Sequence, residues 1–126
     1  MSPINRIDKF DIFDYVNIPY KINNNDNGKN CVELVNLVRT DLNLEPINTF
    51  FSIKTRKKEV LQYIKDNNII INYSPKNLNI SLINNPTFFG LGIFYDNKIL
   101  TTAHDIGSFV FNYPSKKIKL LFFLDL

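Results

Sequence analysis

The hydrophobic and polar positions change their spacing near the middle of the chain. Apolar residues at helical spacing predict a short helix within 7–16, a second from Cys31 to Leu42 and a third across 55–67. After Asn68, short β-branched and aromatic runs separated by turn-forming residues predict strands. Helices followed by an antiparallel meander predict an α+β fold, with the helices packed on one face of the sheet.

Within the predicted helices, the apolar positions mark the sides expected to face the core. Asn30 is a favourable N-cap for the second helix, and Asn43 and Pro46 mark its end. The expected core-facing residues are Leu34, Val35, Val38 and Leu42 in the second helix, and Val60, Leu61 and Ile64 in the third.

The second half of the chain contains the apolar runs expected to form strands. Asp96-Asn97 separates two such runs and predicts a hairpin, and residues 88–124 should form at least three antiparallel strands. The runs are "IIINY", "FFGLGIFY", "KILTTA", "GSFVFN" and "KIKLLFFL".

Composition limits the possible functions. The 126 residues fit a single domain, 1–126, and a net charge of +3 scattered along the chain does not predict a nucleic-acid partner. The densest basic run, Lys54 to Lys58, is expected to be a solvated helical face. One cysteine and one histidine argue against a disulfide or a zinc site, and with four glycines there is no Gly-rich phosphate loop. We therefore expect neither metal nor cofactor.

The two ends of the chain bear on its location. The segment "MSPINRIDKFDIFDYV" is too charged for the core of a signal peptide, and "LLFFLDL" is too short to cross a membrane. The sequence therefore predicts no export signal and no membrane insertion, which corresponds to a cytoplasmic protein unless the chain is part of a virus particle.

Cys31 stands in the first turn of a predicted helix. The partial positive charge of a helix N-terminus favours a thiolate and lowers the pKa of a thiol, as in cysteine hydrolases. A small, buried, hydrophobic cysteine fits the same pattern. The residue types alone leave both interpretations open.

Several segments around Cys31 resemble one family. "IPYK", a loop and "NCVELVNLVRTDLNLEPI" resemble the opening of the NlpC-type cysteine peptidases, above all their short phage-tail branch. "GLGIFYDNKILTTAHDIGSFVFN" resembles the family hairpin and "PSKKIKLLFFL" its last strand, so the resemblance runs from about residue 8 to 124. It implies a papain-like α+β fold and an activity on peptide bonds of cell-wall peptidoglycan.

Position by position, the resemblance implies a site that has lost its chemistry. It makes Cys31 the nucleophile and Tyr20 the residue beside the oxyanion, while the base histidine falls at Gly90 and the third catalytic residue at Thr101. Glycine cannot accept a proton, and threonine does not replace an imidazole near neutral pH. Asn30 stands where the family has an acidic residue before the cysteine.

His104 is the one histidine and hence the alternative base. It follows Thr101 by three residues, so on a regular strand its side chain would point to the opposite face. A β-bulge would bring it back. With Asp105 and Gly107 it also fits a turn, and a hydrogen-bonded structural histidine is the third interpretation.

Three functions follow from these observations. The first is an inactive NlpC-like domain that serves as a structural subunit of a phage tail tip or baseplate, with other virion proteins as partners. The second is an active peptidoglycan peptidase that uses Cys31 and a displaced His104. The third is a module that binds peptide or glycan in the former cleft, with peptidoglycan as the candidate partner.

Overall fold

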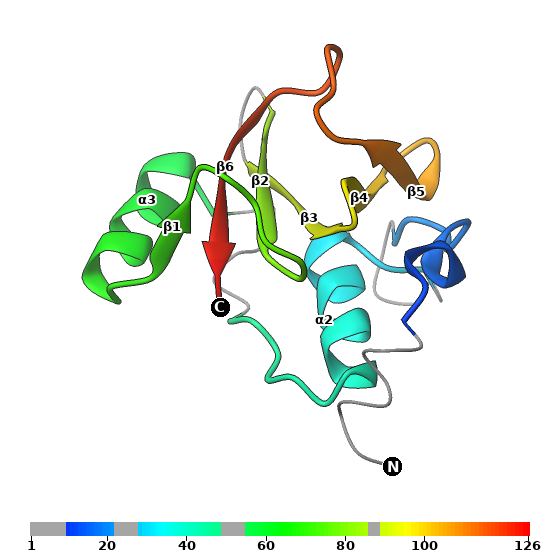
Figure 1. The fold of residues 1–126 in the computed structure, drawn as a ribbon, viewed down its shortest axis with the longest axis horizontal. Coiled ribbons are helices and arrows are strands. Elements are labelled where there is room, and N and C mark those ends of the chain that lie inside the picture. Colours follow the sequence, from blue (N-terminus) through cyan, green and yellow to red (C-terminus); the bar gives the residue numbers. More distant parts are fainter. Residues whose placement is uncertain (1–9, 22–27, 49–54, 86–88) are drawn as a thin grey trace.

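The computed structural model describes residues 10–21, 28–48, 55–85 and 89–126. In these ranges a short 3-10 helix, η1 (Ile12–Tyr15), and two α-helices, α2 (Cys31–Asp41) and α3 (Lys57–Asp66), precede six strands (Figure 1). The strands are β1 (Ile70–Asn72), β2 (Ile80–Asn84), β3 (Phe89–Tyr95), β4 (Lys98–Ala103), β5 (Gly107–Asn112) and β6 (Leu120–Asp125). The predicted α+β class and the strands within 88–124 are confirmed.

The six described strands form one antiparallel sheet in the order β1-β6-β2-β3-β4-β5. The prediction of a simple meander is wrong at one edge, because β6 lies between β1 and β2. The Asp96-Asn97 hairpin is confirmed, and both residues have the positive φ angles, 51° and 61°, that a tight hairpin turn requires. Strand β2 was not predicted, although Ile80 and Leu82 alternate with polar Ser81.

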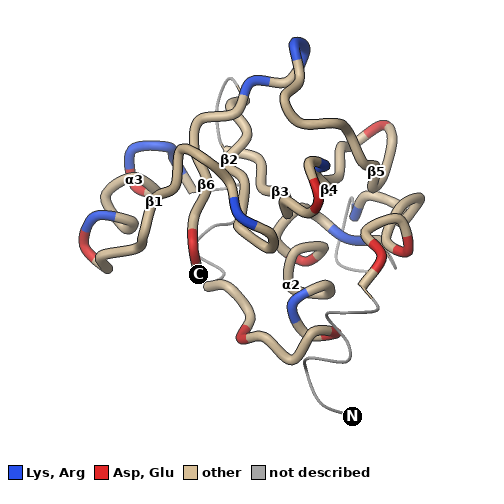
Figure 2. Tube along the Cα trace, in the orientation of Figure 1, with Lys and Arg blue, Asp and Glu red and all other residues tan. Residues whose placement is uncertain are grey.

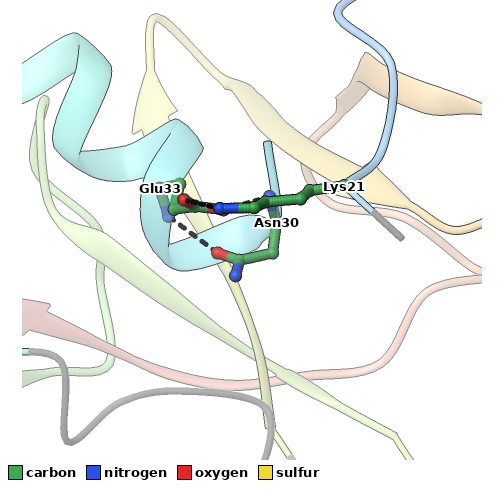
Figure 3. Close-up of polar contacts among 3 residues, drawn as sticks. All are labelled: Lys21, Asn30 and Glu33. Atoms are coloured by element: carbon green, nitrogen blue, oxygen red, sulfur yellow. Dashed lines mark hydrogen bonds and ion pairs between the residues drawn. The ribbon is translucent and has the colours of Figure 1, made fainter. Parts of the chain in front are cut away.

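A capping box fixes the start of α2 (Figure 3). The side chain of Asn30 accepts the Glu33 N–H at 2.9 Å, and the Glu33 carboxylate accepts the Asn30 N–H at 3.2 Å. The ammonium of Lys21 lies 3.0 Å from the same carboxylate. Burial raises the pKa of Glu33, but hydrogen bonds from Asn30 and Lys21 outweigh it and leave that pKa below its ordinary value. These contacts place Cys31 at the first helical position.

The core lies between the helices and one face of the sheet. Helix α2 packs against β3 and β4, while α3 lies beside β1 at the other end (Figure 1). All four core residues predicted for the second helix are buried, the last of them, Leu42, as the C-cap of α2, and so are Val60 and Ile64 of α3. Leu61 is 44% exposed, contrary to the prediction, because it lies about 100° around the helix from Val60.

The first predicted helix is shorter than expected. Only Ile12–Tyr15 form a 3-10 turn, capped by the Asp11 side chain, and positions 7–9 lie outside the described residues. No helix in the described ranges is long and apolar enough to cross a membrane.

Candidate functional site

A pocket of about 370 Å³ opens at the N-terminal end of α2. Its lining includes Tyr20, Cys31, Gly90 and Thr101, which come from the segment before α2, from α2 itself, from β3 and from β4. His104, which follows β4, lines the same pocket. All five candidate residues are therefore brought together, although they are spread over more than half of the chain.

Cys31 forms a buried part of the pocket wall. The residue is 4% exposed, and burial raises the pKa of its thiol, although backbone N–H groups such as that of Leu91 act in the opposite direction. Of the two interpretations that the sequence left open, the structure favours the small buried cysteine, because desolvation of the thiolate outweighs the favourable field of the helix N-terminus. The thiol is therefore protonated at neutral pH.

Gly90 is buried in β3 and contributes no functional group to the pocket. A Cβ atom built there would lie 2.9 Å from the side-chain nitrogen of Asn85 and 3.4 Å from Cβ of Ile83. Asn85 also lines the pocket. The resemblance places the base histidine at Gly90. In this structure the space next to Gly90 is taken by the amide end of the Asn85 side chain.

The Thr101 hydroxyl is already occupied. It donates a hydrogen bond of 2.7 Å to the backbone carbonyl of Leu91 on the neighbouring strand, and the residue is 5% exposed. Its neighbour Thr102 also lines the pocket, and its buried hydroxyl has no hydrogen-bond partner among the described residues. Sequence reasoning missed Thr102, because nothing in the sequence distinguishes it from Thr101.

The segment that carries Tyr20 is fixed from both sides. The Lys29 N–H donates to the Pro19 carbonyl at 2.8 Å, and the Ser108 hydroxyl accepts the Ile18 N–H at 2.7 Å. The phenol of Tyr20 thereby lies at the pocket, and burial raises its pKa, followed by the charges of Cys31 and Glu33. A negative charge on the Cys31 thiolate would therefore disfavour ionisation of the Tyr20 phenol.

His104 lies in the turn that connects β4 and β5, as one interpretation of the sequence predicted. Strand β4 ends at Ala103, so the alternation of side chains along a strand does not apply to His104, which lines the pocket together with Thr101. Its side chain is 65% exposed, and its Nδ1 lies 3.0 Å from the Asp105 carboxylate. His104 is therefore at the mouth of the pocket, whereas Cys31 is buried.

The remaining lining is largely apolar, with Ile83, Phe109 and Ile118 among its residues. Within the ranges that the structure describes, no three His, Cys, Asp or Glu side chains gather to hold a metal ion. Such a pocket can bind an apolar group; its described lining residues include no carboxylate, and the imidazole among them is that of the largely exposed His104. A scan against protein-family models finds no match for the chain, and a search of the curated proteins finds none.

Proposed function

We propose that the chain is a catalytically inactive, papain-like domain of the NlpC type that serves as a structural subunit of a phage tail tip or baseplate. The observation that carries the proposal is the meeting of Cys31, Tyr20, Gly90 and Thr101 at one pocket. The sequence resemblance assigned these four positions to one site. Their convergence supports a shared ancestry, and the glycine at the base position supports the loss of chemistry.

The state of the side chains supports inactivity. A cysteine hydrolase needs a thiolate, a base that accepts the thiol proton and an acid that protonates the leaving amine. Here burial raises the pKa of the Cys31 thiol, Gly90 has no side chain, and the Thr101 hydroxyl is bonded to a carbonyl. General acid–base catalysis is typically worth about 10²–10⁴-fold, so its loss reduces turnover to near background.

One observation favours the active peptidase as the second candidate. His104 lines the same pocket as Cys31, and Asp105 lies where it could orient the imidazole. Against this candidate, the Asp105 carboxylate and the His104 ring are both largely exposed, with 93% and 65% of their side chains accessible. A catalytic pair of this kind is usually shielded from water, which strengthens its electrostatic coupling.

The enzymatic test compares the wild type with Cys31→Ala, His104→Ala and Gly90→His on purified sacculi and on a stem-peptide substrate. We expect the first three proteins to be equally silent. A faint gain in Gly90→His is compatible with the proposal, since only the flexible Asn85 side chain must move to admit the new Cβ. Clear wild-type hydrolysis that both Cys31→Ala and His104→Ala abolish would establish the active peptidase instead.

The assignment to a phage tail rests on the sequence resemblance, and it needs its own test. Mass spectrometry of purified particles should detect the chain at a fixed copy number relative to other tail proteins. Its absence from particles, together with a free monomer in infected cells, would overturn the structural role.

A further inference from the structure

A second concave surface lies where the chain passes from β5 to β6. Its volume is about 400 Å³, and Ile118 is the one described residue that it shares with the pocket at Cys31. We call it the lysine groove and define it by six of its lining residues: Tyr73, Tyr113, Lys116, Lys117, Lys119 and Phe123.

The charge of the lysine groove has one sign. Lys116, Lys117 and Lys119 are exposed, and none of the described lining residues is acidic. In the described part of the chain these lysines form no ion pair. Figure 2 shows basic positions along the β5–β6 connection without an acidic one beside them. The three ammonium groups are therefore available to an anionic ligand.

The fold brings a fourth lysine to the same end of the molecule. The Lys57 ammonium donates to the Asn84 side-chain oxygen at 2.6 Å, and the Asn84 N–H donates to the Lys119 carbonyl at 2.9 Å. The start of α3 thus lies beside the start of β6. Lys57 is not a lining residue of the lysine groove, but these contacts bring it to the same end of the molecule, which local sequence patterns do not reveal.

Aromatic rings form the other half of the lysine groove. Tyr113 is held edge-on by Phe94 and Phe123, with centroid distances of 5.6 and 5.5 Å, so its ring is fixed. Tyr73, which follows β1, is 78% exposed, and its ring meets Phe122 edge-on. A flat ligand can therefore stack on the exposed Tyr73 ring while lysines contact its charged groups.

We propose that the lysine groove binds single-stranded nucleic acid, with the three lysines on its phosphates and Tyr73 stacked on a base. Proteins that bind single strands without sequence preference combine a basic groove with aromatic stacking platforms. An acidic peptide would use the lysines but has no general need for an exposed aromatic ring. The proposal uses no lining residue of the Cys31 pocket except Ile118, so it does not depend on the proposed function.

The test measures fluorescence anisotropy of a labelled oligothymidine of about 12 nucleotides, a length within the usual site size. For three neutralised phosphates, the logarithm of the binding constant should fall with that of the salt concentration with a slope of about −2. Lys116→Ala/Lys117→Ala should weaken binding and reduce the slope to about −0.7. Tyr73→Ala should weaken binding at least about fivefold without changing the slope, and Tyr73→Phe should restore it.

Lys65→Ala, on α3 and outside the lysine groove, is the matched control and should bind as the wild type does. Circular dichroism checks that each variant keeps its fold. Three results would overturn the proposal. They are no binding at about 50 mM salt, equal competition by polyglutamate or polyphosphate, and binding that is indifferent to the lysine and tyrosine changes.

Discussion

The imidazole ring of His104 lies beside the phenol ring of Tyr20, with 5.6 Å between their centroids. One ring belongs to the turn after β4 and the other to the segment before α2, and both line the pocket at Cys31. The single imidazole of the chain is thus packed at the mouth of a pocket in which the single thiol is buried. Because the imidazole is exposed and the thiol is buried, the reactivity of the thiol is the first property to test.

Cys31 should react slowly with a thiol reagent in the folded protein. Its 4% exposure blocks the reagent, and its raised pKa removes thiolate at neutral pH. We expect labelling by a chromogenic disulfide at least about tenfold slower than in urea, with the rate rising only above the ordinary thiol pKa. Since the chain has one cysteine, the signal has one source. Equal rates in native and unfolded protein would contradict the buried thiol.

Ser108→Ala should destabilise the protein and loosen the segment before α2. The buried hydroxyl accepts the Ile18 N–H and donates to the Tyr15 carbonyl at 2.6 Å, so its removal leaves two backbone groups without this partner. We expect a loss of about 1–3 kcal/mol in the free energy of unfolding, measured in urea.

Ser81→Ala is the matched control for this change. Ser81 is fully buried in β2, and its hydroxyl has no hydrogen-bond partner among the described residues. Its removal should leave stability unchanged or slightly raised. Equal losses of unfolding free energy in Ser108→Ala and Ser81→Ala would show that the Ser108 hydrogen bonds do not stabilise the segment before α2.

Gly107→Ala should cost more stability than Gly90→Ala. Gly107 has φ +82°, and a Cβ there would lie 2.7 Å from the Ile18 carbonyl oxygen, so both the backbone and its neighbour would be strained. At Gly90 the closest atom belongs to the Asn85 side chain, which can move. We expect a loss of more than about 1 kcal/mol for Gly107→Ala and a smaller one for Gly90→Ala in thermal unfolding. The reverse order would contradict the geometry of the β4–β5 turn.

Glu33 in the capping box should make the free energy of unfolding fall as the pH is lowered. The pKa of Glu33 is lower in the folded protein than its ordinary value of 4.5, so its contribution is present above that value. The contribution is lost as the pH falls through the folded pKa. Glu33→Gln should therefore lose less stability than the wild type between neutral pH and about pH 3, as measured by urea unfolding. Lys21→Gln removes one of the stabilising contacts and should fall between the two, whereas identical slopes in all three proteins would contradict the ion pair.

The parts of the structure that the sequence predicted are those with local causes. Asn30 and the apolar stripe after it are enough to define α2, and Asp96-Asn97 is enough to define the hairpin. The insertion of β6 beside β2 depends on pairing across the chain, so no local pattern reveals it. The direction of the Cys31 pKa shift likewise follows from burial, which is set by packing. His104 lies in a turn, as one interpretation of the sequence predicted, and strand periodicity does not apply beyond the end of β4.

The contacts that fix the wall of the pocket also determine when it can form. Ser108 bonds to Ile18 and Tyr15, which lie 90 and 93 positions earlier in the chain. During synthesis the Tyr20 segment and α2 emerge long before β5, so these bonds cannot form until most of the chain has left the ribosome. Helix α2 packs against β3 and β4, so the burial of Cys31 also waits for these later strands. The nascent chain therefore passes through an interval in which its thiol is exposed to oxidants that the finished protein excludes.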